Sequence, residues 1–128
     1  MDEAAIRALA QGFFDAIERG DIETVRDSYT DDAVIWHNFD DAEQSKADNL
    51  ETLKGMVGRL SDRHYDNRRL EVFDGGFVQQ HVLRGTRKDG ARLAMPGALI
   101  VQVRDGKISR IDEYLDSAHV AEFRKTFD

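Results

Sequence analysis

The chain has 128 residues, 41% hydrophobic and 34% charged, which is typical of one globular domain rather than of a disordered chain. A net charge of -7 argues against nucleic acid or an anionic membrane as a partner, because both repel an acidic surface. Cysteine is absent, which excludes disulfides, thiolate metal sites and a cysteine nucleophile.

The N-terminal region predicts two helices. The first is indicated by apolar residues that recur every three or four positions: Ile6, Leu9, Phe13 and Ile17. Gly20 ends this helix, and Asp21 can cap a second, shorter one. The second helix is indicated by the same spacing of Ile22, Val25 and Tyr29. The opening residues lack the basic segment and apolar run of an export signal, so we expect a cytoplasmic protein.

A strand, a polar loop and a third helix are predicted next. Residues Ala33–Phe39 are rich in β-branched and aromatic side chains, which favour a strand. Residues 40–48 are polar and predict a loop, with Ser45 or Asp48 as the cap of the following helix. That helix is indicated by the spacing of Leu50, Leu53, Val57 and Leu60.

The C-terminal half predicts an antiparallel meander. Its strands are expected at Phe77–Arg87, Arg92–Arg104 and Lys107–Asp116, and an additional one at Arg68–Phe73. Asp-Gly pairs at the three junctions favour tight turns. A last helix, capped by Asp116 or Ser117, is expected to carry Val120, Phe123 and Phe127. Helices ahead of a meander indicate an α+β fold with helices on one sheet face.

Trp36 and Asn38 form the first candidate site. Side chains alternate along a strand, so Trp36 and Asn38 share one face and His37 takes the other. If the helices cover the Trp36 face, an aromatic wall and an amide that can hold a substrate oxygen or a water face the interior. The alternative is that Trp36 belongs to the core and Asn38 makes a local turn contact.

Two titratable residues could transfer protons. His81 titrates near neutral pH and is a candidate general acid or base, although a structural histidine fits the sequence equally well. Glu113 shares a strand face with Ile111 and Leu115, which would raise its pKa and suit it as a base. The alternative is a surface Glu113 paired with an arginine of a neighbouring strand.

A metal site is the third possibility considered. His37, Asp40 and Asp41 could bind zinc or iron together with His81, but no fixed ligand spacing such as HExxH supports it. No nucleophile-elbow motif supports a catalytic serine either.

The segments FDAIERGDIETVRDSYTDDAVIWHN and DGKISRIDEYLD resemble a SnoaL-like domain of the nuclear transport factor 2-like superfamily. This resemblance implies a cone-shaped α+β barrel, a pocket between the curved sheet and the helices, and a homodimer formed through the outer sheet face. Relatives include ketosteroid isomerases, polyketide cyclases, scytalone dehydratase and limonene epoxide hydrolase. Trp36-His37-Asn38 is similar to the aromatic-x-Asn of the epoxide hydrolases, and Glu113-Tyr114 to their Asp-Tyr. His81 and Leu83 stand where those enzymes carry Arg and Asp.

We therefore expect a cofactor-free enzyme acting on an apolar, oxygen-bearing small molecule as an isomerase, cyclase, dehydratase or hydrolase. The expected catalytic residues are His81, Glu113 and Asn38. The expected substrate-binding residues are Trp36, Phe13, Tyr29 and Met95. The alternative is a binding or dimerisation domain without chemistry, whose pocket is filled by its own aromatic side chains.

Overall fold

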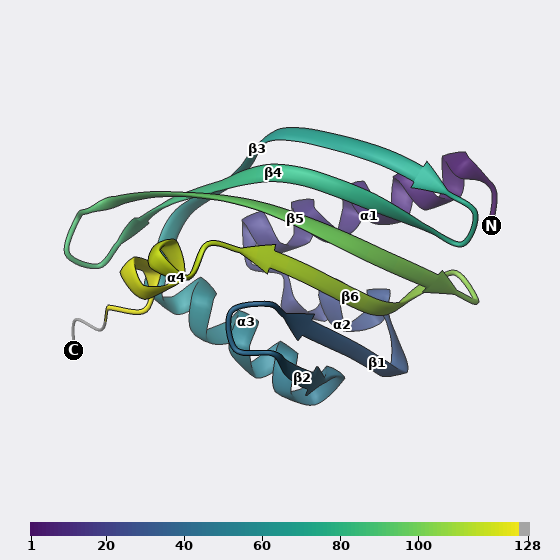
Figure 1. Ribbon diagram of the computed structural model, residues 1–128, viewed down its shortest axis with the longest axis horizontal. Helices are drawn as coiled ribbons and strands as arrows, with labels where there is room; N and C mark the ends of the chain where they lie inside the picture. Colours follow the sequence, from purple (N-terminus) through teal and green to yellow (C-terminus); the bar gives the residue numbers. More distant parts are fainter. Residues whose placement is uncertain (126–128) are drawn as a thin grey trace.

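Six strands form one curved sheet in the computed structural model of the chain, in the order β2-β1-β6-β5-β4-β3 (Figure 1). The structure describes residues 1–125. The strands are β1 (Tyr29–His37), β2 (Ala42–Ser45), β3 (Leu60–Phe73), β4 (Gly76–Arg87), β5 (Arg92–Arg104) and β6 (Lys107–Leu115). Strands β1 and β6 are parallel and the other pairs are antiparallel. Within residues 1–125 the sheet does not close, because β2 and β3 remain its edges.

Helices α1, α2 and α3 lie together on one side of this sheet, and α4 lies near its end (Figure 1). Their bounds are α1 (Glu3–Arg19), α2 (Ile22–Ser28), α3 (Lys46–Arg59) and α4 (Ser117–Phe123). The predicted α+β class is confirmed. The predicted caps are confirmed as well: Gly20 lies in the left-handed region after α1, and Asp21, Ser45 and Asp116 are N-caps.

The turns of the meander follow the predicted chemistry. Gly75, Gly90 and Gly106 have φ angles of 89°, 88° and 77°, which glycine adopts without steric cost. Strand β5 has the predicted bounds, and β4 and β6 differ from theirs by one residue. The meander from β3 to β6 is therefore confirmed.

Strand β3 is longer than predicted, because it begins at Leu60, directly after α3. Its register against β4 breaks twice, next to Asp62 and Asn67, which have φ angles of 52° and 57°. Irregularities of this kind bend a strand and increase its twist, so they help to curve the sheet around the helices. They also interrupt the alternation of side chains, which is why the sequence pattern indicated only Arg68–Phe73.

Three predictions upstream are wrong. Leu60 was expected in the third helix, but α3 ends at Arg59 and Leu60 begins β3. Tyr29 was expected in the second helix, but α2 ends at Ser28 and Tyr29 is the first residue of β1. The predicted loop over residues 40–48 contains the short edge strand β2 and the first turn of α3. Downstream, Val120 and Phe123 lie in α4 as predicted, and Phe127 lies outside the described residues.

The core lies between the concave sheet face and the helices, and includes Phe14, Phe77 and Val101. The convex face carries the outward side chains of the same strands, among them Ile100 and Tyr114, which are 41% and 45% exposed. No helix within residues 1–125 is both long and apolar enough to cross a bilayer.

Candidate functional site

A cavity of about 450 Å³ lies between the concave sheet face and the helices. Its lining is mostly apolar and aromatic. Exposed residues of the lining, Asp40, Glu51, Arg59 and Arg124, mark where it meets solvent, and the Arg124 guanidinium lies 4.9 Å from the centre of the Phe39 ring.

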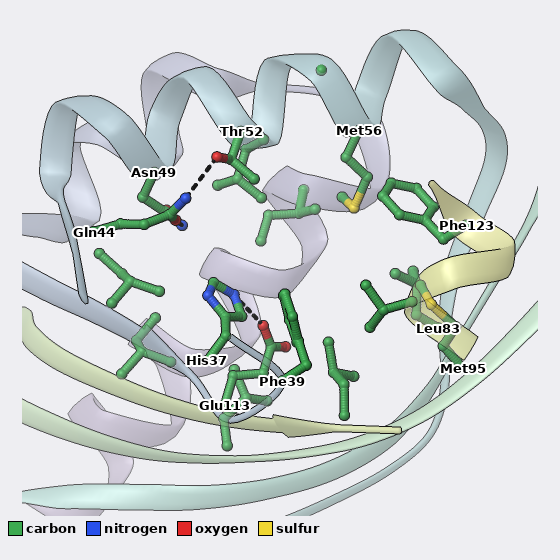
Figure 2. A pocket seen from close by; sticks show the side chains of 18 of the residues that line it. His37, Phe39, Gln44, Asn49, Thr52, Met56, Leu83, Met95, Glu113 and Phe123 are labelled. Carbon is green, nitrogen blue, oxygen red and sulfur yellow. Dashed lines mark hydrogen bonds and ion pairs between the residues drawn. The ribbon is translucent and has the colours of Figure 1, made fainter. Parts of the chain in front are cut away.

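His37 and Glu113 meet on one wall of this cavity (Figure 2). They are register partners in the parallel pairing of β1 with β6, so their side chains project from the same face of the sheet. His37 Nε2 lies 3.0 Å from Glu113 Oε1, and the two side chains are 12% and 21% exposed. Within residues 1–125, His37 Nδ1 and Glu113 Oε2 have no hydrogen-bond partner, and neither is a fully enclosed atom. Both remain available to a bound molecule.

His81 lies on β4, which β5 separates from β6, and it is 4% exposed. Burial lowers its pKa to about 4, although the nearby Glu113 carboxylate acts in the opposite direction. The imidazole is therefore neutral at pH 7. Its ring packs edge-on against Phe14 and Tyr65, with ring centres 5.3 and 4.5 Å away.

A chain of hydrogen bonds crosses the helical side of the cavity, where Asn49, Gln44 and Thr52 lie opposite the His37–Glu113 pair (Figure 2). Tyr29 Oη donates to Asn49 Oδ1 at 2.7 Å, and Asn49 Nδ2 donates to Gln44 Oε1 at 3.0 Å. Gln44 Nε2 then donates to Thr52 Oγ1 at 2.9 Å. Burial, followed by the charge of Glu113, raises the pKa of Tyr29, so its phenol stays protonated and keeps its donor role.

Five of the residues expected at the site line the cavity: Glu113, His81, Phe13, Tyr29 and Met95. The expected inward placement of Trp36 and Asn38 is wrong, because the opposite set of β1 side chains faces the helices. The Trp36 indole donates to Asp41 Oδ1 at 2.7 Å and packs on the exposed Tyr114 ring. Asn38 binds the backbone of Leu115 at the end of β6.

Sequence reasoning considered His37 only as a metal ligand, and it missed other residues of the site, among them Tyr65, Gln79 and the hydrogen-bonded Asn49 and Gln44. His37 was placed on the outer face because the size of Trp36 outweighed the pattern around it. The signal was the alternating set Ala33, Ile35, His37 and Phe39, which is apolar apart from the histidine. Tyr65 lies between the two irregularities of β3, where the alternation of side chains does not show which residues face the helices.

The residues proposed as metal ligands do not form a metal site. His37 and His81 both line the cavity, but residues 1–125 contain no group of three or more His, Asp or Glu side chains arranged to hold a metal ion.

Comparison with protein families matches residues 10–111 to the SnoaL-like domain. Comparison with curated protein sequences finds no match.

Solved structures share the fold. A candidate polyketide cyclase of Xanthomonas campestris pv. campestris superposes with a TM-score of 0.83 at 19% identity, covering 94% of this chain and 97% of that one. An LEH-like epoxide hydrolase of M. tuberculosis superposes with a TM-score of 0.75 at 20% identity, covering 93% of this chain and 87% of that one. A candidate isomerase of Bacillus subtilis superposes with a TM-score of 0.82 at 15% identity, covering 95% of this chain and 94% of that one. At these identities the similarity is one of fold.

Proposed function

Because the chain belongs to the SnoaL-like domain family, we propose that it is an enzyme that moves a proton within an apolar, oxygen-bearing small molecule. The reaction belongs to the isomerase, cyclase, dehydratase or hydrolase type. The observation that carries this proposal is the 3.0 Å contact of His37 Nε2 with Glu113 Oε1 on the wall of a largely apolar cavity of about 450 Å³. A cavity of this size suits a small organic molecule.

His37 is the proton acceptor in this proposal, and Glu113 is its partner. A proton on Nε2 directed to the Glu113 carboxylate leaves Nδ1 unprotonated, with its lone pair free for the substrate. When Nδ1 takes a proton, the carboxylate stabilises the imidazolium that forms. The same proton can then return to another atom of the substrate or to a leaving oxygen, so one residue acts as base and then as acid.

The rest of the cavity supplies orientation and excludes water. Phe13 and Met95 are buried members of its lining, so an apolar ligand gains burial of its carbon skeleton. The Tyr29–Asn49–Gln44–Thr52 hydrogen bonds give the opposite wall a fixed polar edge. Holding the ligand between these walls brings its reacting atom to His37. Asn38, expected as a catalytic residue, acts in this proposal by positioning the two strand ends.

The test uses 2-tetralone, an apolar bicyclic ketone, in D₂O, with NMR to follow exchange of its acidic C–H protons. Hydrolase activity is tested separately with styrene oxide, and mass spectrometry detects the product that has gained a water. Replacing His37→Asn or Glu113→Gln should reduce the faster reaction by about 100-fold or more, the usual contribution of a general acid or base. His64→Gln and Glu71→Gln, which change exposed residues, are the matched controls. Equal rates in the wild type and His37→Asn would remove the proposal.

Ligand binding without turnover would instead indicate a non-catalytic binding domain. Isothermal titration with 2-tetralone measures binding separately from chemistry. In the proposed enzyme, His37→Asn keeps most of the affinity and loses the rate, because the apolar walls are unchanged.

The convex sheet face is proposed to form a homodimer. It presents the rings of Trp36 and Tyr114, which are in edge-to-face contact with centres 5.3 Å apart, and Ile100, which is 41% exposed. These residues come from the neighbouring strands β1, β6 and β5, and Asp112 of β6 is the register partner of both Trp36 and Ile100. A second copy of this surface would remove it from water.

A further inference from the structure

Two hydrogen-bond donors line the same cavity as the proposed proton acceptor. Tyr65 and His81 both line the cavity, and their rings are in edge-to-face contact. Within residues 1–125, neither Tyr65 Oη nor His81 Nε2 has a hydrogen-bond partner, and neither atom is fully enclosed. A buried polar atom without a partner costs free energy, so a bound group is the natural partner for both.

Gln79 determines which nitrogen of His81 carries the proton. Its side chain is 2% exposed, and its Nε2 lies 2.9 Å from His81 Nδ1. An amide NH₂ group can only donate, so Nδ1 must accept and the proton of a neutral imidazole must lie on Nε2. Protonating both nitrogens would break this hydrogen bond.

The strand next to β4 carries a glycine opposite His81. His81 pairs with Gly97 of β5, and a Cβ at Gly97 would lie 3.8 Å from His81 Nε2 and 2.8 Å from Leu115 Cδ2. The first distance is an ordinary van der Waals contact, and the second is a clash, so the Leu115 side chain is what requires a glycine here.

We infer that Gln79 fixes His81 as a hydrogen-bond donor, and that His81 and Tyr65 together bind one oxygen of the substrate. This inference rests on the proposed function and narrows its substrate class. Two donors favour an oxygen that accepts hydrogen bonds, such as the carbonyl oxygen of a ketone, ester or quinone. Negative charge that develops on this oxygen when His37 takes a proton would be stabilised by the same two donors.

The first test is the tautomer of His81, measured by long-range ¹H–¹⁵N NMR at pH 7. We expect a protonated Nε2 and an unprotonated Nδ1. Gln79→Glu should move the proton to Nδ1, because a carboxylate accepts where the amide donated. Gln80→Glu makes the same change on the adjacent exposed residue and should leave the tautomer as it is. A protonated Nδ1 in the wild type would overturn the inference.

The second test compares acetophenone with ethylbenzene, which has no oxygen. NMR titration should show acetophenone binding about tenfold or more tightly, as two hydrogen bonds predict, and Tyr65→Phe should reduce this preference to about threefold. The preference should persist in His37→Asn, so the outcome does not depend on turnover. Acetophenone binding no tighter than ethylbenzene, including no binding of either, overturns the inference, as does a preference that Tyr65→Phe leaves unchanged.

Discussion

The side chain of Asn38 binds the backbone of Leu115 in both directions. Its Nδ2 donates to the Leu115 carbonyl at 3.1 Å, and its Oδ1 accepts from the Leu115 nitrogen at 2.8 Å. The backbone nitrogen of Asn38 also donates to the Glu113 carbonyl at 3.1 Å. Asn38 thus continues the pairing of β1 with β6 beyond the last strand residue, and it holds His37 beside Glu113.

Replacing Asn38 with alanine should affect both stability and rate. Two lost hydrogen bonds at a partly exposed site should lower the free energy of unfolding by about 1–2 kcal/mol, as measured by urea denaturation. If these hydrogen bonds position His37, kcat should fall more than KM rises, because the imidazole is no longer held in the right place relative to the reacting atom. Gln80→Ala, on the convex face, is the control. An unchanged kcat in a destabilised variant would show that the Asn38–Leu115 hydrogen bonds stabilise the fold without affecting catalysis.

The parts of the fold that follow local chemistry were predictable. Asp-Gly turns, helix caps and regular apolar spacing are set by neighbouring residues, so Gly75, Gly90 and Gly106 identified the meander without any tertiary information. Strand β3 was predicted only in part, because its two irregularities break the alternation on which a strand prediction depends.

The candidate site depends on a choice that local sequence does not make. Alternation divides β1 into one set with Trp36 and another with His37, but it does not say which set faces the helices. The orientation of β1 depends on its parallel pairing with β6, a strand distant in sequence. This pairing places His37 next to Glu113. The neutral state of His81 likewise depends on burial by Phe14 and Tyr65, which no spacing within β4 reveals.

The buried His81 should make stability depend on pH. Its folded pKa is about 4, below the usual value of 6.5, so the unfolded chain binds a proton first as pH falls. Stability should therefore fall between about pH 6.5 and pH 4, by at most about 3 kcal/mol, and this loss should level off below the folded pKa. Urea denaturation at pH 7.5 and pH 4.5 measures it. In His81→Gln the loss over this range should be smaller, and an equal loss would contradict the assignment to His81.

Arg63 should contribute strongly to stability, because it joins two helix ends. Its guanidinium donates to the Ile17 carbonyl at the end of α1 at 3.2 Å, and to the carbonyls of Val57 and Leu60 at the end of α3. A cation at helix C-termini also interacts favourably with the helix dipoles. We expect Arg63→Met to lower the free energy of unfolding by about 2–3 kcal/mol. Arg69→Met, on the exposed face of the same strand, should change it by less than about 0.5 kcal/mol.

Charge on the convex face should separate the proposed homodimer. Ile100 lies beside Asp112 in the pairing of β5 with β6, on the face that carries Trp36 and Tyr114. Replacing Ile100 with lysine places an ammonium group in the surface that a second copy would bury, and burying that charge without a designed partner is costly. Light scattering after gel filtration should therefore show a dimer for the wild type and a monomer for Ile100→Lys.

Gln11→Lys adds the same charge on the exposed side of α1 and should remain a dimer. A wild type that is monomeric at every concentration, or a dimer that Ile100→Lys leaves intact, would contradict the convex face as the interface. The separated monomer should keep its cavity, because His37 and Glu113 face the helices on the opposite side of the sheet from Ile100. Retained acetophenone binding by the monomer would therefore show that the interface and the site are independent.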